Sequence, residues 1–391
     1  MSWPLIKLSD VVQVNPRCPR DIDEFQNVSF VAMASASEEG FLLTEETRVL
    51  GETKKGFTYF EKEDVLLAKI TPCFENGKSL RPNQITHAVG FGSTEFHVLR
   101  ADQSKVDSTY LFYMISGKPF RFLGERSMAG AAGQKRVGAD FIKNFEIPLP
   151  PLDEQKRIAA ILDKADAIRR KRQQAIQLAD DFLRSVFLDM FGDPVTNPKG
   201  WEMMPVKDVA EVTTGNTPSR KVPEYYGGKM EWIKSDNINT PEHFLTKATE
   251  FLSDDGLKVA RTVPKGSTLI TCIAGSFDCI GNAAFANREV AFNQQINALT
   301  PKEGMLSWFL YALILFSKKA IQSASTNSMK GMVSKGKLEE VRLIVPPIEQ
   351  QQKFEDIFNN QIEMVAKLRT SSSGIDDCFN SLSQCAFSGQ L

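Results

Sequence analysis

Two stretches of the sequence combine a surplus of positive charge with glycine-containing loops of small residues. Residues 118–143 hold six Lys or Arg side chains against two acids, a net charge of +4, and residues 318–342 repeat this count. Flexible backbone with Lys and Arg is suited to following phosphates, and an amide such as Gln134 or Asn327 can hydrogen-bond base edges. A solvated basic face is the plainer interpretation of one such stretch. Its recurrence favours a nucleic-acid-binding surface.

The residues with the right chemistry for such contacts lie in these stretches and in neighbouring loops. The candidates are Lys69, Asn76, Lys78, Arg126, Gln134, Lys135 and Arg136, then Ser276, Asn293, Gln294, Lys330, Lys335 and Lys337. The chain as a whole carries 47 Lys and Arg against 48 Asp and Glu, a net charge of −1. Binding to nucleic acid must therefore depend on local patches, because the overall charge does not favour it.

Nucleotide-binding motifs are incomplete. The run CFENGKS at 73–79 ends in Gly-Lys-Ser, as a P-loop does, but Pro72 occupies the place of the first glycine of that motif. A proline there removes a backbone N–H from the phosphate cradle. The Gly-x-Gly of GFGSTE at 90–95 lacks the third glycine of a dinucleotide-binding fingerprint. A loop that faces a target is the better interpretation of 73–79.

Motifs for other chemistry are also missing from the sequence. Neither Asn15-Pro16 nor Asp193-Pro194 continues into the Pro-aromatic pair of an amino-methyltransferase motif. The six cysteines form no C-x-x-C pair, and the three histidines show no spacing typical of a metal site or a catalytic triad. We therefore predict that the chain has no catalytic site and binds neither a metal nor a cofactor.

The chain repeats itself at an interval of about 196 residues. PLPPLDEQKRIAAIL at 148–162 returns as IVPPIEQQQKFEDIF at 344–358. The interval grows to about 203 where DVLLAKITPCF at 64–74 returns as STLITCIAGSF at 267–277. Duplication of a whole unit indicates two similar, linked halves.

Each half divides into a globular part and a helical part. In the globular parts, short β-rich runs such as VSFVAM and EFHVLR alternate with Gly, Pro, Asn and Asp, and one aromatic-rich helix is expected near 107–124 and another near 305–322. The predicted parts are 1–147 (globular), 148–196 (helical), 197–343 (globular) and 344–391 (helical). The fold class is α+β: two similar mixed domains separated by two long helices.

Alternating steps of three and four place an apolar stripe on each helical part. The stripe consists of Ile158, Ile161, Ala165, Ile168, Ala175, Ala179, Phe182 and Val186, then Phe354, Ile357, Met364, Leu368, Ile375, Cys378 and Leu382. A stripe repeating every 3.5 residues is typical of coiled coils, so we expect an antiparallel pair of helices about 57 Å long. Residues 370–374 (TSSSG) are poor helix formers. The alternative is that both helices are core helices of one large domain.

These motifs resemble those of a known family. PLPPLDEQKRIAAILDKADAI with the downstream FLRSVFLDMFGDP, and VPPIEQQQKF with the terminal CAFSGQL, resemble the specificity subunits of type I restriction-modification systems. The resemblance covers the whole chain and implies two target-recognition domains, each followed by a helical region. It implies a non-catalytic subunit in which each domain reads one half of a bipartite site on double-stranded DNA. The paired helices would set the gap between the halves.

The resemblance also implies partners. Two modification (methyltransferase) subunits would dock on the helical regions, flip an adenine out of the duplex and methylate it with S-adenosylmethionine. Restriction subunits, which use ATP and Mg, would join for cleavage. These cofactors would be bound by the partner subunits and not by this chain.

Two other functions stay open from the residues alone. The chain could be a coiled-coil scaffold that joins partners without touching DNA, or a stand-alone DNA methyltransferase or NTP-dependent DNA enzyme. A cytoplasmic location is predicted, because the start MSWPLIKLSD lacks a signal-peptide profile and scattered thiols fit a reducing compartment. The apolar run from Trp308 to Phe316 is too short to span a membrane.

Overall fold

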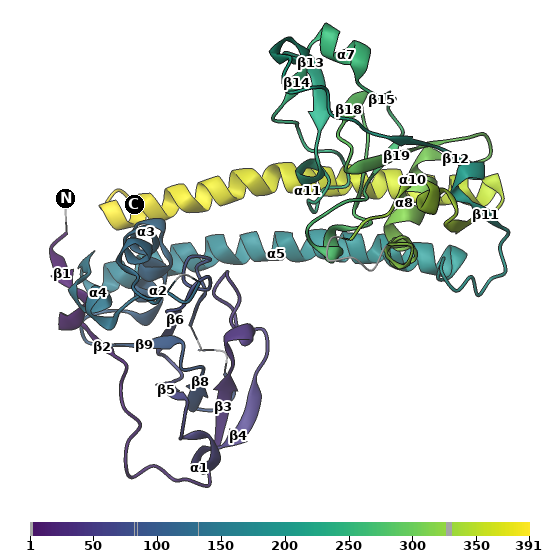
Figure 1. Ribbon diagram of the computed structural model, residues 1–391. Coiled ribbons are helices and arrows are strands. Elements are labelled where there is room, and N and C mark those ends of the chain that lie inside the picture. The colour runs from purple at the N-terminus through teal and green to yellow at the C-terminus, as the bar shows by residue number, and fades with distance from the viewer. Residues whose placement is uncertain (1–2, 82, 84, 132, 326–330) are drawn as a thin grey trace. The chain divides into compact units, whose positions relative to one another are not determined.

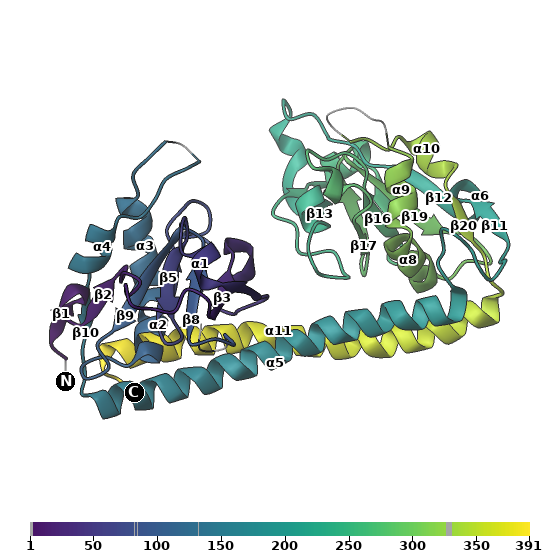
Figure 2. The same ribbon diagram turned by 90° about the horizontal axis from the view of Figure 1, so that it is seen from below.

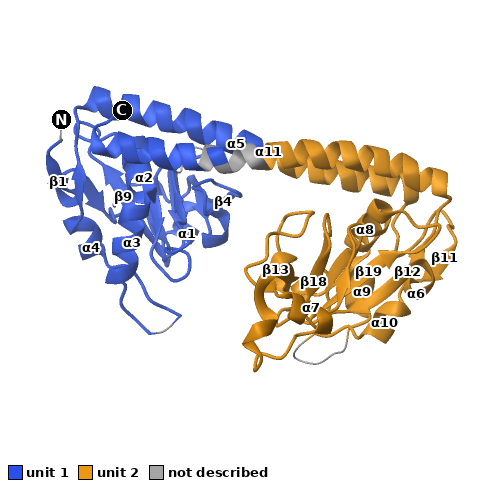
Figure 3. Ribbon diagram, turned by 90° about the horizontal axis from the view of Figure 1, so that it is seen from above, with its two compact units in different colours: residues 1–172, 372–391 blue, residues 173–371 orange. Residues whose placement is uncertain are grey.

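Two units make up the described chain. The structure is a computed structural model that describes residues 3–81, 83, 85–131, 133–325 and 331–391, without the side chains at 370–373, 375 and 376. Unit 1 consists of residues 1–172 and 372–391, and unit 2 of residues 173–371 (Figure 1, Figure 3). Both divisions fall inside long helices, so each unit contains a segment of each long helix.

Short apolar runs between turn residues form the strands of unit 1, as the sequence pattern predicts. One antiparallel sheet has the order β2 (Val12–Val14), β9 (Phe96–Ala101), β6 (Val65–Ala68) and β7 (Ser79–Leu80). A second has the order β4 (Glu46–Val49), β3 (Asn27–Val31), β8 (Val89–Gly92) and β5 (Thr58–Glu61), with β3 and β8 parallel. A ribbon pairs β1 (Leu5–Lys7) with β10 (Glu146–Pro148).

Unit 2 repeats this topology strand for strand. Its antiparallel sheet has the order β12 (Ala210–Thr214), β19 (Ile296–Pro301), β16 (Thr268–Thr271) and β17 (Ala283–Phe285). Its mixed sheet has the order β14 (Phe251–Leu252), β13 (Tyr226–Ile233), β18 (Val290–Phe292) and β15 (Thr262–Val263), with β13 and β18 parallel. The ribbon pairs β11 (Met203–Pro205) with β20 (Arg342–Ile344). The predicted α+β class with two similar domains is confirmed.

Short helices complete both units. Unit 1 carries α1 (Leu50–Thr53), α2 (Ser108–Ser116), α3 (Lys118–Ser127) and α4 (Ala139–Asn144). Unit 2 carries α6 (Val206–Val209), α7 (Asp254–Val259), α8 (Ser307–Phe316), α9 (Lys318–Ser323) and α10 (Lys335–Glu339). The single helix predicted near 107–124 is wrong, because the helix breaks at Gly117 and α3 begins at Lys118, with Pro119 in its first turn. The helix predicted near 305–322 is likewise divided, at Ser317.

The two long helices are α5 (Leu152–Phe191) and α11 (Ile348–Ser388), and each begins directly after a Pro-Pro pair. The backbone of α11 stays helical through the run TSSSG at 370–374, which the sequence marks as its weak point. The four-part division at 147/148, 196/197 and 343/344 stays a prediction about domains.

Within each unit the two helix segments lie side by side and antiparallel (Figure 1, Figure 2). In unit 1, Arg157 near the start of α5 donates to the carbonyl of Leu391, and Arg169, three turns later, lies over the ring of Phe379. In unit 2, Phe187 meets Phe354 with ring centroids 5.4 Å apart. Rising numbers on α5 thus pair with falling numbers on α11.

The buried stripe of the helices differs from the predicted one. Of the predicted seam, Ile158, Ala179 and Phe354 are buried, while Ile161, Ala165, Ala175, Val186, Leu368 and Leu382 are half-buried. Ile168, Phe182, Ile357, Met364 and Cys378 are exposed, and this part of the prediction is wrong; the side chain of Ile375 lies outside the described residues. In unit 2 a row of fully or largely buried side chains includes Leu183, Phe187 and Phe191 on α5 and Phe354, Phe358 and Ile362 on α11. This i, i+4 row arises because each helix packs on a globular domain as well as on its partner helix.

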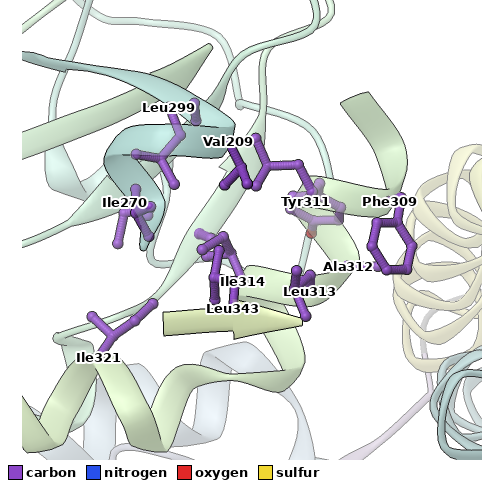
Figure 4. Close-up of a cluster of buried hydrophobic side chains, with 14 of the residues drawn as sticks. Val209, Ile270, Leu299, Phe309, Tyr311, Ala312, Leu313, Ile314, Ile321 and Leu343 are labelled. Carbon is purple, nitrogen blue, oxygen red and sulfur yellow. The ribbon is translucent and has the colours of Figure 1, made fainter. Parts of the chain in front are cut away.

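Each unit has a core that its domain and its helices share. In unit 2, Val209, Ile270, Leu299 and Leu343 from the strands and α6 gather around α8, as Figure 4 shows. The same cluster continues into the long helices, because Phe309 of α8 lies 5.0 Å from Phe191 by ring centroids. In unit 1 the matching contact joins Tyr110 of α2 to Phe387 at 5.5 Å. The alternative, that both long helices are core helices of one large domain, is therefore wrong: each unit has a separate core to which the helices contribute.

The glutamine shared by the two Pro-Pro motifs joins helix to domain. Gln155 is fully buried; its Oε1 accepts the backbone N–H of Asp107 at 2.9 Å, and its Nε2 donates to the carbonyls of Lys105 and Pro150 at 2.9 and 2.8 Å. The motif therefore recurs because it fixes the start of a long helix to the loop before α2.

Unit 2 repeats this joint with Gln351. Its Oε1 accepts the N–H of Leu306 at 3.0 Å, and its Nε2 donates to the carbonyls of Gly304 and Pro346 at 3.0 and 2.9 Å. All the partners are backbone groups, so the joint does not depend on the side chains around it.

We predict that Gln155→Ala or Gln351→Ala lowers the free energy of unfolding by roughly 1–3 kcal/mol, because each change leaves three backbone groups without their partner. Urea unfolding of the full chain measures this. Gln352→Ala is the control, since that exposed amide bonds only to Asp356 in the described structure, and it should change stability by less than about 0.5 kcal/mol. Equal losses for Gln352→Ala and Gln351→Ala would contradict the joint.

Candidate nucleic-acid interface

A glycine-containing hairpin projects from unit 1 between α3 and α4 (Figure 2). Ala129 and Arg136 form its base, exchanging backbone hydrogen bonds of 3.1 and 2.9 Å, and Arg136 also pairs with Ile70. Gly130 and Gly133 have φ values of 131° and 80°, conformations that side chains with a Cβ rarely adopt. The hairpin thus exposes Gln134, Lys135 and Arg136 on a base that is hydrogen-bonded into the domain.

Three charged residues meet at the base of this hairpin. The Nε and Nη2 atoms of Arg136 donate to the carboxylate of Glu95 at 2.9 and 2.8 Å, and Nη1 donates to the carbonyl of Gln134 at 3.2 Å. The N–H of Lys69 donates to the carbonyl of Glu95 at 2.9 Å. The hydrogen bonds from Arg136 hold the pKa of Glu95 below its usual value. Predicted contact residues Lys69, Gln134, Lys135 and Arg136 therefore lie together.

The other candidates of unit 1 lie apart from this cluster. Asn76 is exposed and donates to the carboxylate of Glu38 at 2.7 Å. Lys78 reaches the carbonyl of Met33 at 3.4 Å, and Arg126 lies over the ring of its neighbour Phe122 on α3. These side chains stay predictions as contacts.

Unit 2 has the same backbone arrangement with different side chains. The N–H of Cys272 donates to the carbonyl of Gln295, and the N–H of Val333 donates to the carbonyl of Cys272, both at 2.9 Å. Ile273 pairs with Met332 as Ile70 pairs with Arg136. The positions of Lys69, Glu95 and Arg136 are thus taken by Cys272, Gln295 and Met332, none of which is charged.

The unit 2 candidates are dispersed. Lys335 and Lys337 are exposed on α10, Ser276 is exposed before the turn Phe277–Cys279, and Gln294 is exposed and accepts a hydrogen bond from Thr217. The prediction of Asn293 as a DNA contact is wrong. This residue is 8 % exposed, and its side-chain amide bonds to Gln295, so it does not offer a surface contact. Lys330 and Asn327 lie outside the described residues.

A buried histidine supports the hairpin of unit 1. His97 is 6 % exposed; its Nε2 donates to the carbonyl of Val137 at 3.0 Å, and its Nδ1 accepts from the amide of Asn15 at 3.0 Å. Burial lowers the pKa of His97 and so favours the neutral form of the ring. Sequence reasoning missed this residue and Glu95, because their partners lie 40 or more positions away.

The near P-loop at 73–79 does not form a phosphate cradle. Ser79 is buried in strand β7, and its hydroxyl bonds to that of Ser116 at 2.9 Å. A P-loop requires a helix N-terminus at this place. Gly77 faces the guanidinium of Arg121, which a Cβ at that position would approach to 2.4 Å. This loop therefore packs against α3 of the same unit.

The described residues offer no metal cluster: nowhere among them do three or more His, Cys, Asp or Glu side chains gather closely enough to hold an ion. Within the same residues, no helix is both long and apolar enough to cross a membrane. The six cysteines are free thiols.

Unit 1 also contains a cavity of about 720 Å³ beside the helices, with Gly117, Phe112, Arg169 and Ser383 among its lining residues. A shift of 196 residues equates Ser383 with Phe187, which is fully buried in unit 2 against Phe309, Phe316 and Phe354. The position of Ser383 is therefore taken in unit 2 by a buried aromatic ring.

Comparison with known proteins gives the family. A family model described as the type I restriction modification DNA specificity domain matches residues 2–178 and again 198–370. The chain belongs to this family. Each matched segment contains one globular domain and much of the long helix that follows it, so the two matches coincide with the two copies of the repeat.

Relatives within the specificity family match over parts of different length. The type I restriction enzyme EcoEI specificity subunit of Escherichia coli is 40% identical over 163 residues, which is 41% of this chain and 27% of the relative. The HindI specificity subunit of Haemophilus influenzae is 23% identical, with 85% of each chain covered. This specificity-family chain thus spans about a quarter of the EcoEI relative.

A solved relative shows the same fold. The crystal structure of the type I restriction-modification system S subunit from M. genitalium aligns with a TM-score of 0.59 at 13% identity, covering 99% of this chain and 96% of that one. The likeness extends through both units and both long helices.

The buried histidine predicts a pH dependence for unit 1. Because the pKa of His97 in the folded state is below its ordinary value of 6.5, the neutral ring stabilises the fold above that pH. This stabilisation is lost as the pH falls from 6.5 through the folded-state value. We expect unit 1 to lose stability between pH 7.5 and pH 5, and His97→Gln to flatten that profile, as measured by urea unfolding.

His87→Gln is the matched control, because that ring makes a single hydrogen bond in the described structure, to Thr47 at 3.4 Å. A profile that is unchanged in His97→Gln, or flattened equally by His87→Gln, would assign the pH dependence to other groups.

Proposed function

We propose that this chain is the DNA-recognition subunit of a type I restriction-modification complex and has no catalytic activity of its own. The observation that carries the proposal is the duplication in a specificity-family chain: two domains of one topology, each joined by a buried glutamine to a long helix. A protein with two similar recognition domains is suited to a target that has two similar parts.

Each domain would read one half of a bipartite site on double-stranded DNA. In unit 1 the hairpin supplies Lys135 and Arg136 beside Lys69, and in unit 2 α10 supplies Lys335 and Lys337. Lys and Arg side chains on exposed backbone follow phosphates, and the neighbouring amides can contact base edges. The proposed role of α5 and α11, with 40 and 41 residues, is to fix the gap between the half-sites.

The helices would also dock two modification subunits. Phe182 of α5 and Met364 of α11 are 50% and 45% exposed in unit 2, although the heptad pattern of the sequence includes both. Exposed apolar side chains at heptad positions are suited to packing against a helix of a partner protein. The modification subunits would bind S-adenosylmethionine, and restriction subunits would bring ATP and Mg, so that none of these cofactors is held by this chain.

We predict that Lys135→Ala and Lys337→Ala each weaken binding of the assembled complex to its site, because each removes a phosphate contact. The slope of log K against log salt should fall by about 0.9 for each lost contact. Titration of labelled duplex at several salt concentrations measures both values. Lys62→Ala, a change at an exposed turn before β6, should leave the slope unchanged. A salt slope that stays at the wild-type value in Lys135→Ala would show that the hairpin does not contact DNA phosphates.

For the helical face, we predict that Phe182→Asp combined with Met364→Asp weakens association with the modification subunit by roughly 10- to 100-fold, because burial of these side chains would be lost. Gel filtration and calorimetry of the full chain with the subunit measure this. Gln174→Asp, on an exposed position of α5, is the control. Wild-type affinity in the double variant, with the chain still folded, would place the docking surface elsewhere.

A further inference from the structure

The two units differ in side-chain charge at three structurally equivalent positions. The equivalence is fixed by backbone hydrogen bonds: the N–H groups of Lys69 and Cys272 donate to the residues Glu95 and Gln295, each at 2.9 Å. Arg136 then corresponds to Met332 through the paired bridges to Ile70 and Ile273. The backbone pairings at these three positions are shared, whereas the side chains differ in charge.

Arg136 is oriented by its neighbours. Glu95 accepts from Nε and Nη2, and the carbonyl of Gln134 accepts from Nη1, so three of the five N–H donors have partners. Two donors remain without an acceptor in the described part of the chain. Two N–H groups of one guanidinium are what the O6 and N7 atoms of guanine accept in the major groove.

The guanidinium is both accessible and restrained. The side chain of Arg136 is 43% exposed, while that of Glu95 is 26% exposed. The backbone of Arg136 is tied on one side to Ala129 and on the other to Ile70, and Glu95 is tied to Lys69. A side chain ordered before binding loses less conformational freedom when the complex forms. An exposed ion pair contributes little to folding stability, so stability alone gives little reason for this arrangement.

We propose that Arg136 reads a guanine in the half-site of unit 1, with Glu95 as the residue that positions its guanidinium. Unit 2 places Met332, which is 39% exposed, at the same point, so its half-site is read there by apolar contact. The proposal rests on the proposed function, because it presumes that unit 1 faces DNA. It adds which base is read, by which residue, and in which half-site.

The test uses the full chain assembled with its modification subunits. Once the methylated motif is known, binding is measured for duplexes in which each guanine of each half-site is replaced singly by another base or by 7-deazaguanine, which lacks the N7 acceptor. With wild-type protein, one guanine in one half-site should show a loss of about 10-fold or more on either replacement. Arg136→Ala should bind the native and replaced duplexes equally at that position, with the other half-site read as before.

Variants of Arg136 and of the residues beside it distinguish recognition of a base from electrostatic attraction to DNA. Glu95→Gln keeps the positive charge of Arg136 but removes the carboxylate that orients it, so discrimination at that guanine should fall while affinity for unrelated DNA rises. Arg136→Lys should keep the charge and lose most of the discrimination, because an ammonium is not a planar fork. Lys135→Ala should lower affinity for all duplexes alike.

The outcomes are distinguishable. Arg136→Ala with unchanged discrimination at every position, in a complex that still binds its site, would overturn this inference and leave the proposed function intact. Retained discrimination in Glu95→Gln would overturn the positioning role of Glu95. A wild-type complex that binds all duplexes equally would instead contradict the proposed function itself.

Discussion

The joint between each long helix and its domain is the constraint on which the rest of the structure depends. Gln155 and Gln351 are buried amides whose partners are backbone atoms of the domain and of the Pro-Pro motif. An unpaired buried amide or backbone group is costly, so the helix start and the domain loop must move together. A rigid joint allows a reading surface on the domain to be placed by the helix.

The two joints reach the same result with different neighbouring residues. In unit 1 the N-terminus of α2 is capped by Asp107, whose carboxylate accepts from Thr109 and Tyr110 at 2.9 Å. In unit 2 the capping position is Leu306, which has no acceptor, and the carboxylate of Glu355 on α11 accepts from Trp308 and Phe309 instead, at 2.7 and 3.3 Å. The capping carboxylate thus comes from the residue before the short helix in unit 1 and from the long helix α11 in unit 2, although the backbone arrangement of the joint is the same.

The repeat, the Pro-Pro starts and the α+β class could be predicted from sequence because they depend on local pattern. The exposure of Phe182 and Met364 could not, because a heptad pattern assumes one partner, whereas each helix also packs on a domain. Glu95 and His97 were missed because their contacts with Arg136 and Val137 are made across 40 residues or more. Asn293 has the right chemistry for a base contact, but its burial is decided by tertiary packing.

In the proposed function, the long helices and their glutamines set the geometry, and a few exposed side chains on each domain choose the DNA sequence. Mapping methylated adenines in a host that carries this chain with the proposed modification subunits tests this most directly, before and after residues 1–147 are exchanged for another domain of the family. We expect one motif with two parts and a constant gap, of which the exchange alters one part only. A continuous motif, or an exchange that leaves both parts unchanged or alters both, would contradict it.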